Sequence, residues 1–200
     1  MAAILTSLRN TVIAGFVLAA VLLLMYLNWG GAIYHNFGAF VFRWLHVISG
    51  IMWIGLLWYF NFVQIPNMPK IPDEQKPAIS KVIAPEALFW FRWGAMSTII
   101  TGLILATMNG YFMDALTLGW WEDFDVPKDT AIGIGMWLGT IMWFNVWFVI
   151  WPNQKIALGI VSAPAEAKPA AARTAMLFSR TNTLLSIPML FAMVSAQNIY

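Results

Sequence analysis

The chain has 200 residues, of which 60% are hydrophobic and only 10% are charged, with a net charge of +2 and a mean hydropathy of +0.72. Soluble globular domains carry roughly 25% charged residues, so this composition indicates an integral membrane protein. A spanning helix needs about 20 apolar residues, which leaves no room for a sizeable extramembrane catalytic domain. The basic residues are scattered, which argues against nucleic acid as a partner. The absence of Cys excludes disulfides, iron–sulfur clusters and thiolate metal sites.

Long apolar stretches bounded by charged residues or prolines predict an all-α membrane bundle of five transmembrane helices. The predicted spans are residues 11–28, 39–65, 89–112, 131–152 and 174–197. The first span is longer than the apolar core of a secretion signal and lacks a cleavage site, so we expect a retained anchor. Residues 1–200 are accordingly predicted to form a single transmembrane domain.

The basic loop residues predict the orientation of the bundle. One side collects most of them: Arg9, Lys70, Lys76, Lys81, Lys155, Lys168 and Arg173. The other side has Lys128 as its only basic loop residue. Because cytoplasmic loops are enriched in Lys and Arg, we expect a cytoplasmic N-terminus and a C-terminus outside.

Two loops have a distinctive composition. The third loop, predicted to lie outside, contains five acidic residues beside Trp120 and Trp121: Asp114, Glu122, Asp123, Asp125 and Asp129. Such a loop is either a solvated surface with an interfacial aromatic belt or a docking surface for a basic soluble electron carrier. The second loop is predicted to be a stiff connector without helix, because it contains Pro66, Pro69, Pro72, Pro77 and Pro85.

The second span contains the strongest candidate for chemistry. His46, Gly50 and Trp53 are spaced four and three residues apart and so share one helix face. An intramembrane His in apolar surroundings suits a haem axial ligand, with Gly50 leaving room for the macrocycle. The alternative is a His hydrogen-bonded to a neighbouring helix, with Gly50 as a packing notch. Arg43, one turn away, is expected either to pair with a haem propionate or to extend to the interface.

A second haem ligand is not evident from the sequence. His35 lies about 16 Å from His46 along a continuous helix, so the two cannot bind one iron from opposite faces. We expect His35 to be an ordinary interfacial residue. The methionines predicted to lie at the depth of His46 are more often core residues than ligands. These are Met108, Met136, Met189 and Met193.

Polar residues within the spans predict where helices pack together. Asn145 lies in the fourth span, and Arg180, Thr181 and Asn182 lie in the fifth. We expect these polar residues to face the bundle interior. Arg180 is close enough to the cytoplasmic end that its side chain could instead extend out of the bundle. Pro188 is expected to kink the fifth span. A further group of small and polar residues is assigned to helix packing: Ser97, Thr98, Thr101, Gly102, Gly135 and Gly139.

Three stretches carry a pattern that extends from about residue 39 to the end of the chain. They are residues 43–55 (RWLHVISGIMWIG), 136–159 (MWLGTIMWFNVWFVIWPNQKIALG) and 179–195 (SRTNTLLSIPMLFAMVS), supported by residues 84–102 (APEALFWFRWGAMSTIITG). Together they resemble the membrane domain of the bacterial urate hydroxylase family, known as the urate oxidase N-terminal domain. The resemblance implies a membrane oxidoreductase that passes electrons to cytochrome c, and a location in the bacterial cytoplasmic membrane.

The chain departs from that family at several histidine positions. Thr181 stands where the family usually has the His of an Arg-His-Asn triplet, and a further expected His is absent near Gln197. The family also usually has a glycine-rich segment with a His after the second span, whereas residues 61–71 of this chain contain no His. His46 is the one member of this set that the chain retains.

These observations and the resemblance predict a membrane subunit associated with electron transfer that either holds one b-type haem through His46 or supports a redox complex that holds one. Arg43, Gly50 and Trp53 are the other predicted cofactor-binding residues, the catalytic residues are unknown, and a soluble cytochrome c is the predicted electron acceptor. The alternative is a non-catalytic accessory subunit packed in a larger respiratory, photosynthetic or monooxygenase complex. A transporter is disfavoured, because the predicted spans contain no acidic residue and no inverted repeat.

Overall fold

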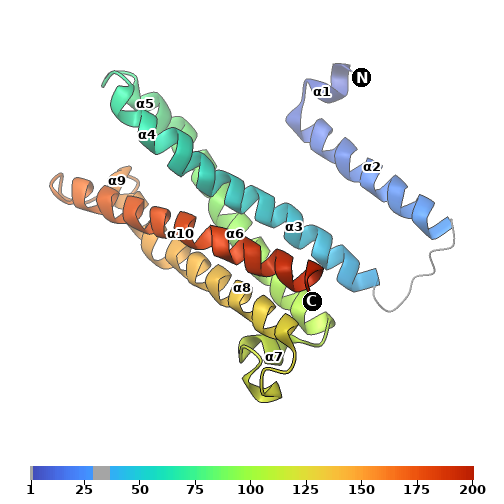
Figure 1. The fold of residues 1–200 in the computed structure, drawn as a ribbon. Helices are drawn as coiled ribbons and strands as arrows, with labels where there is room; N and C mark the ends of the chain where they lie inside the picture. The colour runs from blue at the N-terminus through green and yellow to red at the C-terminus, as the bar shows by residue number, and fades with distance from the viewer. Residues whose placement is uncertain (1, 29–36) are drawn as a thin grey trace. The chain divides into compact units, whose positions relative to one another are not determined.

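The structure is a computed structural model that describes residues 2–28 and 37–200. The chain divides into two compact units, Met1–Phe40 and Val41–Tyr200. Every regular element in the described ranges is a helix, which confirms the predicted all-α class. The first unit contains α1 (Ala2–Leu5) and α2 (Leu8–Asn28) (Figure 1). The apolar residues of α2 occupy all of its sides, as suits a helix that crosses a membrane.

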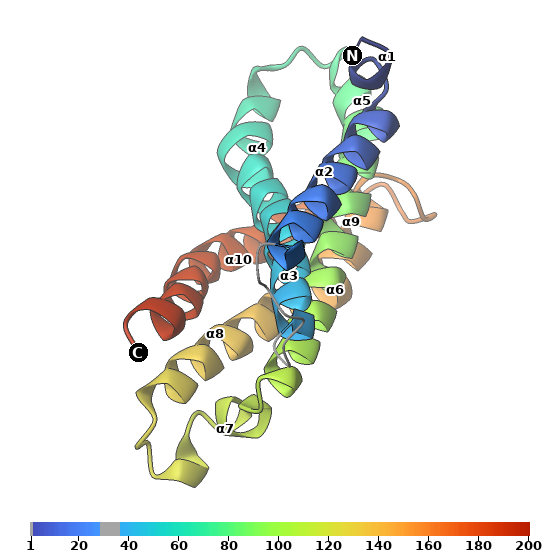
Figure 2. The same cartoon turned by 90° about the vertical axis from the view of Figure 1, so that its right-hand side faces the viewer.

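The second unit is a bundle of long helices built from shorter consecutive segments. In chain order these are α3 (Phe37–Trp58, which begins in the first unit), η1 (Tyr59–Gln64), α4 (Ile65–Asn67), η2 (Met68–Lys70), α5 (Lys76–Ala78), η3 (Ile79–Ile83), α6 (Ala84–Met108), α7 (Phe112–Leu116), η4 (Trp120–Glu122), α8 (Pro127–Phe144), η5 (Asn145–Ile150), α9 (Trp151–Ala157) and α10 (Ala167–Asn198). Figure 2 shows the same helices from the side.

Five helices in the described ranges are long and apolar enough to cross a membrane, which confirms the predicted number of spans. They are Leu8–Asn28, Phe37–Lys70, Lys76–Met108, Pro127–Ala157 and Ala167–Asn198. Each contains or largely overlaps the corresponding predicted span and extends beyond it.

The prediction that the second loop has no helix is wrong for most of its prolines. Helical structure continues through Pro66, Pro77 and Pro85, and only residues 71–75 interrupt it. The three π-helical segments η1, η3 and η5 each end two residues before a proline.

In each segment the residue before the proline donates its backbone N–H to the carbonyl five residues earlier. The donors and acceptors are Ile65 to Phe60, Ala84 to Ile79 and Trp151 to Val146. A proline ring clashes with the carbonyl four residues before it in a regular α-helix. A π turn inserts one residue and widens the helix locally. The wider turn explains how these helices accommodate proline.

The core of the second unit lies where α3, α6, α8, η5 and α10 meet. Figures 1 and 2 show α10 running alongside α8, with which it makes its most extensive contacts. The fully buried large side chains there include Trp53, Phe91 and Met142. Burial of each such side chain contributes about 1.5–3 kcal/mol in water, whereas in lipid close packing replaces that driving force.

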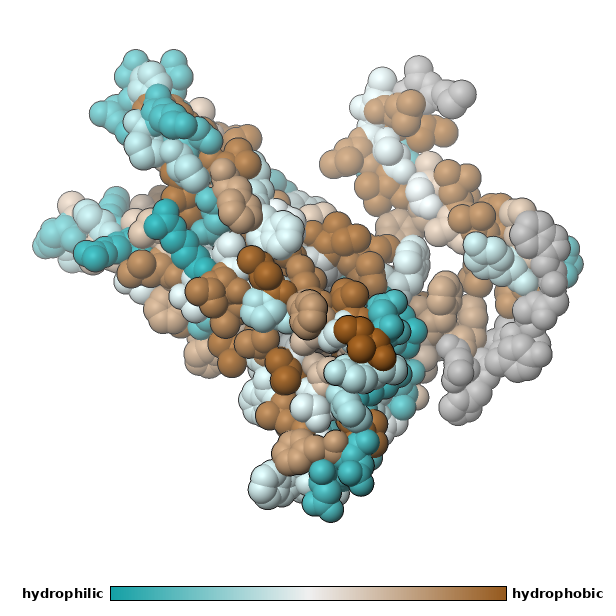
Figure 3. All heavy atoms as spheres, viewed as in Figure 1, coloured by the Kyte–Doolittle hydropathy of each residue, from teal (hydrophilic) through white to brown (hydrophobic). Residues whose placement is uncertain are grey.

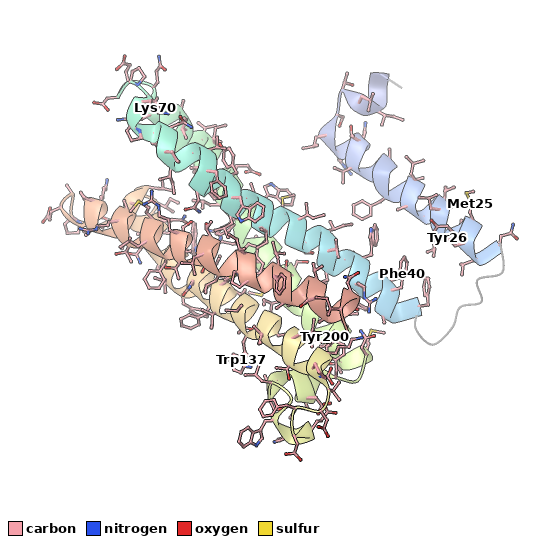
Figure 4. All side chains as sticks on the ribbon, viewed as in Figure 1. Met25, Tyr26, Phe40, Lys70, Trp137 and Tyr200 are labelled. Carbon is pink, nitrogen blue, oxygen red and sulfur yellow. The ribbon has the colours of Figure 1, made fainter. Side chains whose placement is uncertain are left out.

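The two ends of the second unit differ in charge. The turn at Lys70 and the connection between α9 and α10 lie at one end, and the acidic loop that follows α7 lies at the other end together with Tyr200 (Figures 1 and 4). Figure 3 shows apolar surface over the middle of this unit and hydrophilic surface at its ends. This arrangement fits a multi-pass membrane protein, and the orientation of the termini stays a prediction.

Candidate functional site in the helical bundle

His46 lies on α3 and contacts α6. Its Nδ1 is 2.9 Å from the backbone carbonyl oxygen of Thr98. A carbonyl oxygen only accepts hydrogen bonds, so Nδ1 must carry the proton. In the neutral ring this leaves Nε2 with a free lone pair. The ring is therefore in the tautomer that metal-binding histidines adopt when a carbonyl orients them.

Gly102 provides the space for this ring on α6. A Cβ at position 102 would lie 2.9 Å from Cε1 of His46 and 3.1 Å from its Nδ1. Contacts between carbon atoms are normally about 3.5–4.0 Å, so no larger residue fits without moving the ring. The close approach of α3 and α6 extends along both helices, because Ser49 and Ser97 share a 2.8 Å hydrogen bond and Trp53 packs on Gly94.

The other predicted cofactor residues lie in different surroundings. Trp53 is 1% exposed and belongs to the core, Gly50 has no atom within 4 Å of where a Cβ would be, and Arg43 is exposed. The packing notch beside His46 is Gly102 rather than Gly50. His35 falls outside the described residues.

The four candidate methionines lie away from the immediate neighbours of His46 that the structure shows. Met193 packs against Gly135, Met189 belongs to the hydrophobic core, and Met108 is exposed. Met136 is half-buried and packs near Ala115 and Ile132. The contacts of His46 instead come from α6: the Thr98 carbonyl, the Thr101 hydroxyl at 3.4 Å and Gly102.

A second polar group lies within the bundle, where α10 meets α8 and η5. Asn145 donates its side-chain amide to Oδ1 of Asn182 (2.9 Å), and Asn182 donates to the carbonyl of Met142 (2.9 Å). Both asparagines are buried, which confirms the expectation that they face the interior. The same expectation is wrong for Thr181, which is exposed, because residues adjacent in a helix point about 100° apart. Arg180 is exposed as well, in agreement with the alternative that it extends out of the bundle.

Sequence reasoning missed two further partners of α10. Asn61 donates to Ser179 Oγ (2.8 Å), and Trp58 donates its indole N–H to Ser186 Oγ (3.0 Å). Ser179, Asn182 and Ser186 are spaced three and four residues apart, so one face of α10 carries all three. That spacing was a readable signal, whereas the identity of their partners depends on how the helices pack.

Arg92 is a third polar group that the sequence did not reveal. Its guanidinium lies 3.3 Å from the ring centroid of Trp151, in a cation–π contact between α6 and α9. Its Nη1 atom is buried without a hydrogen-bond partner. Arg92 thus joins two helices at their charged ends.

The acidic loop folds into a compact structure between α6 and α8. Trp137 of α8, labelled in Figure 4, donates its indole N–H to the carbonyl of Leu116 (2.9 Å), and Thr130 Oγ1 donates to the carbonyl of Leu118 (3.0 Å). Of the five acidic residues, Asp114, Glu122 and Asp129 converge, whereas Asp123 and Asp125 are exposed.

The fold and the site together define a class, namely a polytopic helical membrane protein with one histidine held between two of its helices. Within this class, residues 122–198 match the family described as Urate oxidase N-terminal. The resemblance inferred from the sequence is therefore confirmed for the region that contains α8, η5, α9 and α10. Comparisons with curated proteins and with solved structures find no match.

Proposed function

We propose that this protein is an integral membrane subunit associated with electron transfer that holds one b-type haem through Nε2 of His46. The observation that carries the proposal is the hydrogen bond from His46 Nδ1 to the carbonyl of Thr98. It leaves Nε2 as the available nitrogen and fixes the direction of the ring. When bound, the haem would supply one-electron transfer at its iron.

The chain's own residues would position the cofactor in complementary ways. Gly102 and Thr98 on α6 restrict the rotation of the His46 ring, and the open surface at Gly50 leaves room on the same side of α3. Arg43 is exposed one turn before His46, where its guanidinium is available to a propionate. Trp53 contributes by anchoring α3 in the core, which holds the His46 backbone in place.

We also propose the cellular setting of this subunit. The N-terminus would lie in the cytoplasm of a bacterium, and the acidic end would face outward. The exposed carboxylates Asp123 and Asp125 would then attract a basic soluble cytochrome c, because opposite charges accelerate association. Partial similarity to the Urate oxidase N-terminal family supports this setting.

The test is an oxidised-minus-reduced absorption spectrum of the detergent-purified protein, expressed with a haem precursor supplied. A b-type spectrum is expected in the unaltered protein and in His35→Ala, and its loss is expected in His46→Ala. His35→Ala is the matched control because His35 is the only other histidine. A colourless protein, or a haem spectrum that survives His46→Ala, would refute haem ligation by His46.

A second candidate function is that of an accessory subunit without a cofactor. It is favoured by the large exposed aromatic surface of the second unit, which includes Trp90, Trp93 and Trp137 at 49%, 49% and 44% exposure. Under this proposal the His46 bond serves only to pack α3 on α6. The protein should then copurify with a larger membrane complex in fixed stoichiometry and lack a haem spectrum, and recovery only as a free protein would exclude it.

A further inference from the structure

Two basic side chains lie against one indole ring where α6 meets α9. The guanidinium of Arg92 lies 3.3 Å from the ring centroid of Trp151, and Nζ of Lys155 lies 5.7 Å from the same centroid. Trp151 and Lys155 are four residues apart on α9 and so share one helix face, which Arg92 approaches from α6. Two helices therefore bring two positive charges together beside one aromatic ring.

No acidic side chain balances these two charges. The only ion pair among residues 2–28 and 37–200 lies elsewhere, at the start of α5. The one acid of α6, Glu86, accepts a hydrogen bond from the indole N–H of Trp90 (3.0 Å), and α9 contains no acid. Arg92 and Lys155 are both half-buried, and Nη1 of Arg92 is buried without a hydrogen-bond partner. Because a partly buried cation without an anion is unfavourable, an anion from outside the chain would stabilise this arrangement.

The two cations lie at the level where a bilayer has its phosphate groups. The third predicted span begins at residue 89 and the fourth ends at residue 152, so Arg92 lies just inside one boundary and Lys155 just outside the other. Both are within one helical turn, about 5 Å, of the predicted edge of the apolar region. Trp90 and Trp93, each 49% exposed, flank Arg92 as in an interfacial aromatic belt.

We propose that Arg92 and Lys155 bind the phosphate of an anionic phospholipid, with the Trp151 ring holding the two side chains beside each other. The planar guanidinium of Arg offers parallel N–H donors to two phosphate oxygens, and Lys adds a compact positive charge. A lipid is favoured over a soluble anion, because the two cations lie at the predicted edge of the apolar region, where lipid phosphates are concentrated. Anionic lipids attract basic residues to the cytoplasmic leaflet, which agrees with the cytoplasmic side predicted for this end.

This site is separate from the proposed haem site. Gly102, which contacts His46, lies about 15 Å from Arg92 along α6. Neither Arg92 nor Lys155 is among the residues that contact His46. The lipid would instead hold α6 and α9 together at the opposite end of the second unit.

The experiment measures lipid binding to the full-length, detergent-purified protein by native mass spectrometry. Delipidated protein is titrated with phosphatidylglycerol or with phosphatidylcholine of the same acyl chains. The two cations together should make phosphatidylglycerol bind about 25-fold more tightly than phosphatidylcholine. Phosphatidylglycerol should also raise Tm, since it binds the folded protein. Inorganic phosphate should neither displace the lipid nor raise Tm.

Arg92→Gln and Lys155→Gln should each weaken phosphatidylglycerol binding about fivefold. Lys81→Gln is the matched control, because it makes the same charge change at an exposed position of the helix that contains Arg92. It should bind phosphatidylglycerol as tightly as the unaltered protein. Circular dichroism and size exclusion check that each variant is folded, and Lys155→Gln keeps the test decisive if Arg92→Gln does not fold.

Three results would overturn the proposal. The first is equal affinity for phosphatidylglycerol and phosphatidylcholine. The second is unchanged affinity in Lys155→Gln, or an equal loss in Lys81→Gln, which would indicate only a general attraction to the basic end. The third is displacement of the lipid by inorganic phosphate, which would assign the two cations to a soluble anion. Haem content does not enter this test, so its outcome is separate from that of the proposed function.

Discussion

Substituting Gly102 tests the contact between His46 and α6 directly. In Gly102→Ala the new methyl group would lie 2.9 Å from Cε1 of His46, about 0.6 Å inside the shortest normal carbon contact. The ring has to move, and the 2.9 Å bond from its Nδ1 to the Thr98 carbonyl lengthens or breaks. Overpacking of this kind costs about 1–3 kcal/mol.

The expected net effect follows from two opposing contributions. Alanine favours helix over glycine by up to about 1 kcal/mol, so Gly102→Ala should destabilise the protein by about 1 kcal/mol. Gly55→Ala is the control, because no atom lies within 4 Å of its Cβ position. That variant should stabilise the protein by up to about 1 kcal/mol. A difference of about 2 kcal/mol corresponds to a Tm difference of about 4–8 °C between the two variants.

Thermal unfolding in detergent, followed by intrinsic tryptophan fluorescence, measures this difference. A double variant adds a direct check on the cause. His46→Ala removes the ring, so Gly102→Ala should lose its destabilising effect in that background. Equal Tm changes in Gly102→Ala and Gly55→Ala, or an unchanged penalty in the His46→Ala background, would refute the close contact.

Two further predictions concern polar groups at other positions. Asn182→Leu should lower the stability by about 1–3 kcal/mol, since it leaves the buried amide of Asn145 without its acceptor. Thr181→Leu, at an exposed position, should change the stability by less than about 0.5 kcal/mol. Similar Tm values for the two variants would contradict this prediction. Desolvation and neighbouring acids raise the pKa of Glu122 above its ordinary value, so its contribution to stability should be lost as pH rises through the raised pKa. Glu122→Gln should flatten that part of the Tm-against-pH curve, and an identical curve would show that Glu122 is not responsible.

The number and approximate position of the spans followed from the sequence alone. A stretch of about 20 apolar residues satisfies its backbone hydrogen bonds within one helix, so lipid solubility and helix formation depend on local composition. The resemblance over residues 122–198 was likewise readable, because its motifs are continuous in the chain. The prediction of helix-breaking prolines failed, since the three π turns are a backbone adjustment that composition does not encode.

Only the tertiary structure decided which side chains act together. The sequence placed His46 in a span, but the tautomer of its ring depends on the carbonyl of Thr98. Thr98 lies 52 residues away in the chain and contacts His46 only because α3 packs on α6. The acidic loop showed five carboxylates, and folding separates the three that converge from the two exposed ones. Local composition fixes how a segment meets lipid or water, whereas contacts across helices depend on the rotation and depth of each helix, which many small packing interactions determine jointly.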